Sequence, residues 1–229
     1  MNLFCFAHAG GTTMSYNLLK RELKHPVNLI LVELPGRGTR FSEPLLDNME
    51  DMLEDVYANI KQILNQGEFA FIGHSMGGRI AFEMAHKIYT KNRRLPKHLF
   101  ISSAKVPHTM KSHWIHELPD EQFFEQVYKL GGTSREIFDD HVLRKTYLPV
   151  LRADFKALEL FESPISREPL DSAVTVLYGE GESFLESEMS EWGTFFNSEC
   201  TITTFPGDHF YIFSQISQVS KLIMNTLFK

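Results

Sequence analysis

The segment Phe69-Ala-Phe-Ile-Gly-His-Ser-Met-Gly-Gly78 constrains the fold of this chain more than any other. It places the pattern Gly-x-Ser-x-Gly after a run of β-forming residues and before a run with helical periodicity. In that context the serine occupies a tight, strained turn from strand to helix, and small residues on either side leave room for the backbone. We therefore expect the Ser75 hydroxyl to project from the edge of a sheet, at the N-terminus of a helix.

The rest of the chain alternates in the same way. Short apolar runs, with little alternation of polar residues, are typical of strands that are covered on both faces of a parallel sheet. The longer runs between them have helical spacing, as in Ile80, Met84 and Ile88. The fold class is therefore predicted to be α/β, with a mostly parallel, doubly wound sheet. The predicted strands are Leu3–Ala7, Val27–Glu33, Phe69–Gly73, His98–Ser102, Ala173–Tyr178 and Thr201–Phe205.

One stretch, from about Lys105 to Leu170, has no convincing strand. It contains helical patterns around Glu121–Leu130 and Asp140–Phe161, and Pro149 is expected to kink or divide the second. The stretch has too few apolar residues for a core of its own. We interpret it as a helical lid inserted at about 105–170 into a single domain that spans residues 1–229.

A serine hydroxyl needs a base to become a useful nucleophile. Where Gly-x-Ser-x-Gly marks a strand–turn–helix, that base follows the last strand. His209 meets this condition, since it lies on a Pro-Gly turn directly after the strand predicted at Thr201–Phe205. Ser75 and His209 are the predicted catalytic pair for cleavage of an acyl ester or thioester.

A third residue, an acid, should orient the histidine from the end of the penultimate strand. No aspartate lies there. Glu182 is the candidate, with Glu180 as the alternative. Asp208 is adjacent to His209 in the sequence, and this adjacency disfavours a good orienting geometry.

The negative charge of the tetrahedral intermediate requires two backbone N–H groups. Met76, the residue after the nucleophile, should supply one. The second should come from the loop after the first strand, where His8 or Ala9 is the expected donor, and Gly10 and Gly11 allow close approach.

Composition and charge indicate which partners and which cellular location to expect. The net charge of −6 disfavours nucleic acid as a partner. The N-terminal apolar run is too short for a signal peptide, and no segment has the length of a membrane span, so we expect a cytoplasmic protein without membrane contact. Cys5 and Cys200 lie in predicted strands, and we expect buried free thiols.

Two groups of polar residues have alternative interpretations. Arg37 and Arg40 could bind a phosphate, but pairing with nearby carboxylates such as Glu33 or Glu43 is favoured. A histidine cluster near Trp114 fits no zinc signature, and no metal is expected there. Its members are His108, His113 and His116.

Five stretches, taken in order, resemble the type II thioesterases, the stand-alone editing enzymes of nonribosomal peptide and polyketide synthases. They are Phe6-Ala-His-Ala-Gly-Gly11, Glu33-Leu-Pro-Gly-Arg-Gly-Thr-Arg40, Gly73-His-Ser-Met-Gly-Gly78, Leu130-Gly-Gly132 with Leu148-Pro-Val-Leu-Arg-Ala-Asp-Phe155, and Phe205-Pro-Gly-Asp-His-Phe210. The resemblance implies an α/β-hydrolase fold and a helical lid that borders the substrate channel.

The resemblance also implies a substrate. That substrate is an acyl group held as a thioester on the phosphopantetheine arm of an acyl or peptidyl carrier protein, and hydrolysis would remove stalled or mis-loaded groups. The chain departs from the family at Glu182, where an aspartate is usual, and at Ala7-His8, where proline and an aromatic residue are common. No cofactor is required, and a monomer is expected.

Two other functions compete with this hypothesis. One is a carboxylesterase or lipase that acts on free small esters. The other is a non-catalytic acyl-binding module on the same fold, favoured only by the missing aspartate. Reaction of Ser75 with a fluorophosphonate separates the enzymes from the binding module.

Overall fold

The computed structural model describes residues 1–107, 114–131, 136, 139–164, 167–183 and 186–228. Six strands of this part form one sheet, in the order β2-β1-β3-β4-β5-β6, and every neighbouring pair is parallel. The α/β class and the parallel sheet are therefore confirmed. All six predicted strands are present, each within one residue of its expected ends. They are β1 (Asn2–Phe6), β2 (Asn28–Val32), β3 (Phe69–His74), β4 (His98–Ser102), β5 (Ala173–Gly179) and β6 (Cys200–Phe205).

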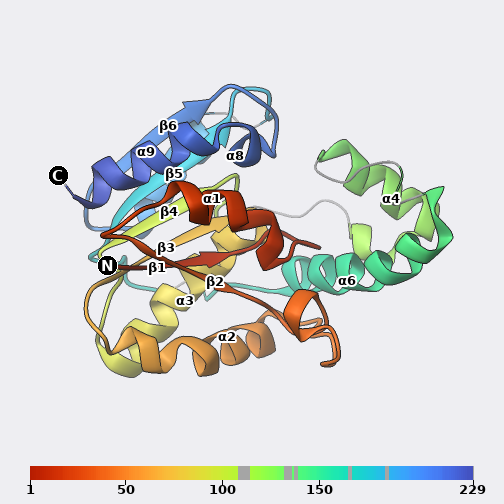
Figure 1. The fold of residues 1–229 in the computed structure, drawn as a ribbon, viewed down its shortest axis with the longest axis horizontal. Coiled ribbons are helices and arrows are strands. Elements are labelled where there is room, and N and C mark those ends of the chain that lie inside the picture. The colour runs from red at the N-terminus through yellow and green to blue at the C-terminus, as the bar shows by residue number, and fades with distance from the viewer. Residues whose placement is uncertain (108–113, 132–135, 137–138, 165–166, 184–185, 229) are drawn as a thin grey trace.

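Helices cover both faces of the sheet (Figure 1). One face carries α1 (Asn17–Glu22) and α9 (Ile216–Leu227), which contact each other. The other carries α2 (Met49–Leu64) and α3 (Met76–Asn92). The order of the strands reverses between β1 and β3, and in open α/β sheets ligands bind at such a point, beyond the carboxyl ends of the strands. Shorter elements connect these helices and strands: η1 (Thr13–Tyr16), η2 (Gly38–Arg40), α7 (Glu186–Ser190), η4 (Glu191–Phe195) and α8 (Tyr211–Ser214).

The side chains of β1 explain why the strands are continuously apolar. Leu3 and Cys5 point into the core beneath α1 and α9, whereas Phe4 and Phe6 point into the core beneath α2 and α3. Successive strand residues face opposite sides, so a sheet covered on both sides needs apolar residues at every position. Cys5 is a buried free thiol, as expected, while Cys200 is also free but only half-buried.

The insert between β4 and β5 contains η3 (Ile115–Glu117), α4 (Asp120–Lys129) and α6 (His141–Leu160). It lies beyond the carboxyl ends of the strands (Figure 1). Contrary to the expectation that it has no core, it holds a small apolar cluster around Phe123, Val127 and Leu151. Pro149 lies inside α6 without dividing it. The buried residues Val150 and Leu151 follow directly, and their packing offsets the hydrogen bond that the proline lacks.

A buried ion pair joins the insert to the sheet. Two nitrogens of Arg37, which follows β2, donate to the two carboxylate oxygens of Asp154 on α6, at 2.5 and 2.7 Å. The Arg37 and Asp154 side chains are 4% and 0% exposed. The same carboxylate accepts the Gly10 N–H at 2.7 Å, so it also holds the loop after β1. We call these three groups the Arg37–Asp154 clamp.

Arg37 and Arg40 therefore both pair with carboxylates, as the sequence analysis favoured. The partner of Arg37, however, is not one of the nearby carboxylates that were expected. Its partner, Asp154, lies far away in the sequence, whereas Glu33 accepts hydrogen bonds from Thr13 and Thr39. Arg40 does pair with Glu43, and it pairs with Asp55 as well. None of the described helices has the length and apolar composition to cross a membrane.

The clamp generates a stability prediction. Asp154→Leu leaves Arg37 buried without a partner, and Arg37→Met leaves Asp154 likewise, so each single variant should lose roughly 3–5 kcal/mol of unfolding free energy. The double variant removes both charges and should lose clearly less than the sum of the two. Urea denaturation of the four proteins measures these differences. Additive losses would contradict a direct coupling between the two side chains.

Candidate active site

Ser75 lies in the sharp turn between β3 and α3. Its backbone has φ 54° and ψ −116°, a left-handed conformation that side chains rarely adopt, and its N–H donates to the Ser102 carbonyl at 2.7 Å. A Cβ on Gly73 would lie 1.9 Å from the Gly77 carbonyl oxygen, and a Cβ on Gly77 would lie 2.0 Å from that of Phe6. Only glycine fits at either position, so both glycines of the motif are required by packing.

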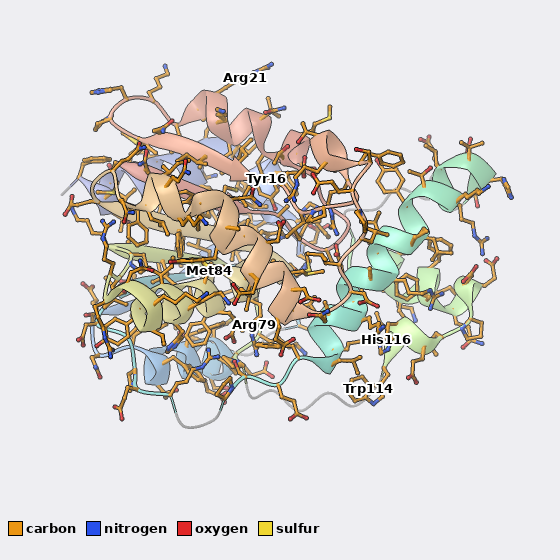
Figure 2. The ribbon with its side chains drawn as sticks, turned by 90° about the horizontal axis from the view of Figure 1, so that it is seen from below. Tyr16, Arg21, Arg79, Met84, Trp114 and His116 are labelled. Carbon is orange, nitrogen blue, oxygen red and sulfur yellow. The ribbon has the colours of Figure 1, made fainter. Side chains whose placement is uncertain are left out.

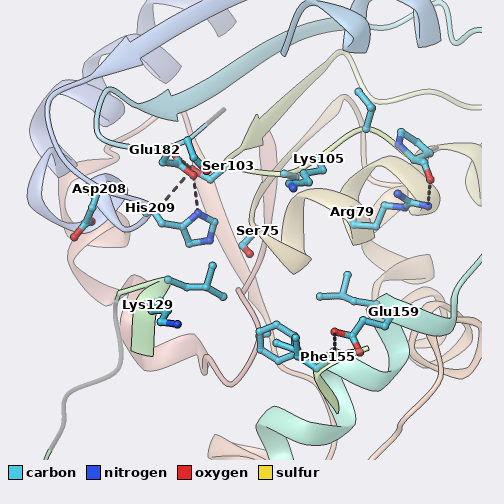
Figure 3. A pocket seen from close by; sticks show the side chains of 18 of the residues that line it. Ser75, Arg79, Ser103, Lys105, Lys129, Phe155, Glu159, Glu182, Asp208 and His209 are labelled. Atoms are coloured by element: carbon cyan, nitrogen blue, oxygen red, sulfur yellow. Dashed lines mark hydrogen bonds and ion pairs between the residues drawn. The ribbon is translucent and has the colours of Figure 1, made fainter. Parts of the chain in front are cut away.

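Ser75 opens into a cavity of about 710 Å³ at the carboxyl edge of the sheet. Its lining comes from the segments that follow five strands, namely β1, β3, β4, β5 and β6, and from the insert. Figure 3 shows the His209 ring between the Glu182 carboxylate and the Ser75 hydroxyl. The predicted nucleophile, base and acid thus meet in one cavity. The residues that line it are Ala9, Ser75, Arg79, Ser103, Ala104, Lys105, Val106, Pro107, Ile115, Lys129, Leu130, Phe155, Leu158, Glu159, Gly181, Glu182, Ser183, Asp208 and His209.

Glu182, not Glu180, contacts the histidine. Its Oε2 lies 2.7 Å from His209 Nδ1, whereas Glu180 is exposed. The other oxygen, Oε1, accepts the Ser103 hydroxyl at 2.6 Å and the Gly179 N–H at 2.8 Å. Burial alone would raise the pKa of Glu182, but the three hydrogen bonds that it accepts outweigh burial and hold the pKa below its ordinary value. The carboxylate is therefore ionised at neutral pH.

The backbone after β5 explains how a glutamate reaches this place. The Glu182 N–H donates to the Gly179 carbonyl, so the chain folds back on the end of its own strand. A Cβ on Gly179 would lie 2.3 Å from the Asp208 carbonyl oxygen, which shows how closely the loop that carries His209 approaches. Sequence analysis missed Ser103. Its φ of 49° at the end of β4 is the mark of a special position, but the sequence does not reveal it.

The loop after β1 differs from expectation at His8. The His8 N–H donates to the Tyr16 hydroxyl at 3.3 Å, and the ring Nδ1 lies 3.0 Å from the same oxygen. Ala9, the alternative, lines the cavity, while His8 lines a separate small pocket behind it. The His8 amide is therefore already bonded to Tyr16, whereas Ala9 lines the cavity that contains Ser75. Met76 is the first residue of α3, where backbone N–H groups have no partner within the helix.

A second buried histidine, which the sequence did not single out, lies behind His209. His74 is fully buried, and its ring centroid is 5.1 Å from that of His209. Its Nδ1 lies 2.9 Å from the Ser102 hydroxyl, which lies 2.6 Å from the Tyr211 hydroxyl. Burial lowers the pKa of His74 well below its ordinary value, and the neighbouring His209 and His8 lower it further. His74 is therefore neutral and supports the His209 ring by contact alone.

The histidine cluster near Trp114 is only partly within the described structure. His116 bonds through Nδ1 to Glu159 on α6, so it ties η3 to that helix. His108 and His113 lie outside the described residues. Within the described part of the chain, no three potential metal ligands form a group.

Comparison with known proteins agrees with this geometry. Thioesterase PikA5 of Streptomyces venezuelae is 30% identical over 228 residues, which cover 99% of this chain and 81% of that protein. The gramicidin S biosynthesis protein GrsT of Aneurinibacillus migulanus is 32% identical over 215 residues, covering 93% and 83%. The structure of ClbQ, from the colibactin NRPS/PKS pathway, superposes with a TM-score of 0.93 at 28% identity, covering 99% of this chain and 96% of that one.

The solved structures that superpose on this chain are thioesterases of the α/β-hydrolase fold, so the architecture described above is that fold. The family model for the thioesterase domain matches residues 1–227, nearly the whole chain. The chain belongs to the thioesterase family and is a hydrolase of the type II thioesterase group.

Proposed function

We propose that this protein is a serine thioesterase that removes acyl groups from the phosphopantetheine arms of carrier proteins, in nonribosomal peptide or polyketide biosynthesis. One observation carries the proposal. Ser75, His209 and Glu182 come from three separate loops, yet they line one cavity in the order nucleophile, base and acid. Structural packing alone gives no reason for a strained serine, a histidine and an ionised glutamate to converge there.

The first half of the reaction acylates the enzyme. His209 takes the Ser75 proton while the serine oxygen attacks the thioester carbonyl. Glu182 accepts a hydrogen bond from the Nδ1–H group of His209, which leaves Nε2 free to act as the base. The tetrahedral intermediate then collapses, its C–S bond breaks, and the pantetheine thiolate leaves with a proton from His209. The second half repeats these steps with water and releases the carboxylic acid and free Ser75.

Backbone groups stabilise the oxygen on which negative charge develops. The proposed donors are the N–H groups of Met76, at the N-terminus of α3, and of Ala9, in the loop after β1. The helix dipole favours negative charge at the first site. The Arg37–Asp154 clamp fixes the second, because Asp154 binds the N–H of Gly10, the next residue. Preorganised donors of this kind lower the barrier by amounts of about 3–4 kcal/mol each.

The insert supports an acyl substrate. It contributes Ile115, Leu130, Phe155 and Leu158 to the cavity wall, and these apolar side chains suit an acyl chain. We propose that it acts as the lid of the site. The relative GrsT is named for gramicidin S biosynthesis, and the similar structure ClbQ comes from the colibactin NRPS/PKS pathway, which supports a carrier-bound substrate over a free ester.

A comparison of two substrates tests the proposal. The same butanoyl group is presented on a phosphopantetheinyl carrier protein and as a small alkyl ester, and release of butanoate is followed for both. We expect a higher kcat/KM for the carrier, with all turnover lost in Ser75→Ala. Equal or faster hydrolysis of the free ester would favour a carboxylesterase. A Ser75 that neither turns over substrate nor reacts with a fluorophosphonate would favour the binding module.

The acid generates a second prediction. Glu182→Gln keeps the shape of the side chain but removes its charge, so kcat should fall by about 10³–10⁴-fold, the scale of such changes in serine hydrolases. Glu180→Gln, two residues away and exposed, is the matched control and should retain activity. Steady-state kinetics with the acyl carrier protein measure both. Loss of activity in the control, or its retention in Glu182→Gln, would show that another group orients His209.

Ser103 gives a third prediction. Its hydroxyl donates to Glu182 Oε1, so Ser103→Ala should let the carboxylate turn away from His209 and lower kcat by about tenfold, the value of one charge-assisted hydrogen bond. KM should change little, because Ser103 acts through Glu182. Ser103→Thr retains the hydroxyl and should recover much of the loss. Equal kcat in the alanine variant and the parent enzyme would exclude this positioning role.

A further inference from the structure

Arg79 places a positive charge in the same cavity as the nucleophile. It lies in the first turn of α3, four residues after Ser75, and both residues line the cavity. Figure 3 shows it on the side of Ser75 opposite to His209. Figure 2 shows it on the side of the core that faces the insert, toward His116. Its side chain is 12% exposed.

The charge of Arg79 is only half compensated. Glu83, which is buried, accepts a hydrogen bond from Arg79 Nε at 3.0 Å. The same carboxylate also pairs with Arg167, so two guanidinium groups share one negative charge. Burial lowers the pKa of Arg79, Glu83 raises it and Arg167 lowers it again. The three side chains together carry one net positive charge at the cavity wall.

Arg79 also has hydrogen-bonding capacity to spare. Its Nη2 lies 3.5 Å from the Pro107 carbonyl, the outer limit of a hydrogen bond, and its Nη1 donates to none of the described residues. Nη1 is not fully enclosed by protein atoms, so it remains accessible to a ligand. The ring of Phe161 lies below the guanidinium at 5.5 Å and fixes its plane. A planar guanidinium with free donors matches a carboxylate.

The surrounding groups leave room for such a ligand. Val106 and Leu158 are apolar residues of the cavity wall that also contains Arg79. Glu159, the acidic group on the insert side, accepts the N–H groups of Ile115 and His116 and bonds to the His116 ring. The Glu159 carboxylate therefore forms its hydrogen bonds with η3. Lys105 adds a second cation to the lining.

We propose that Arg79 binds a carboxylate at the far end of a short acyl chain, so that the enzyme prefers half-thioesters of small dicarboxylic acids to apolar acyl groups of the same shape. This inference rests on the proposed function, since it concerns the acyl group that is attached to Ser75 during the reaction. Arg79 is a specificity residue in this proposal and takes no part in proton transfer.

Pairs of acyl thioesters with matched shape, each presented on the phosphopantetheine arm of a carrier protein, test the proposal. Malonyl is compared with 3-methylbutanoyl, succinyl with 4-methylpentanoyl and glutaryl with 5-methylhexanoyl, each pair differing only in carboxylate against isopropyl. We expect the carboxylate member to have the higher kcat/KM in at least one pair. We call the kcat/KM of the carboxylate member divided by that of its apolar partner the carboxylate ratio. In Arg79→Met this ratio should fall by about tenfold or more, the effect of losing a hydrogen bond to a charged group. Arg79→Lys should retain part of it.

Arg167→Met is the matched control, because it removes a cation from the same carboxylate, Glu83, without lining the cavity. It should lower the ratio by much less than Arg79→Met does, because the guanidinium that binds the carboxylate stays in place although Glu83 then pairs with Arg79 alone. Thermal melting confirms that each variant is folded, and Arg79→Gln replaces Arg79→Met if the latter is not. A wild-type enzyme without preference in any pair, or an equal shift in Arg167→Met, overturns the inference. Absence of turnover for all six thioesters would instead contradict the proposed function, and the inference with it.

Discussion

The close contact between the start of α3 and the end of β1 is the constraint on which the site depends. Gly77 lies against the Phe6 carbonyl with no room for a side chain, so the helix begins directly above the strand. This contact fixes Ser75 in its left-handed conformation and brings the N-terminus of α3 next to the loop that contains Ala9. The nucleophile and the proposed Met76 donor are therefore positioned by backbone packing, whereas the proposed Ala9 donor also depends on the Asp154 side chain that holds the Gly10 N–H.

Glu182 shows how a different acid fits the same arrangement. A glutamate has one more rotatable bond than an aspartate, and that extra freedom would weaken its hold on His209. Here Ser103 and the Gly179 N–H both bind the distal oxygen, so the longer side chain has one orientation. The departure from the usual aspartate is thus compensated by donors from β4 and β5. Their combined effect also keeps the carboxylate ionised despite its burial.

The sequence predicted those features that local pattern and chain order determine. All six strands, the position of Ser75 and the place of His209 after the last strand follow from apolar runs and one motif. Contacts between residues that are distant in the sequence could not be predicted in this way. Arg37 was paired with near neighbours, although its partner is 117 residues away, and Ser103 was missed because its partner, Glu182, is 79 residues away. The use of the His8 amide by Tyr16 likewise depends on how a loop folds, which no spacing rule describes.

The Arg37–Asp154 clamp has a consequence for how the site can admit substrates. Asp154 lies on α6 directly before Phe155, which lines the cavity, and holds both Arg37 and the loop after β1. If this part of α6 swung outward, it would pull the Gly10 N–H with it and displace the neighbouring Ala9 N–H. The C-terminal half of α6 must therefore stay in place while the enzyme is competent. Any motion of the insert as the proposed lid would therefore leave this part of α6 in place, held to the core by Asp154.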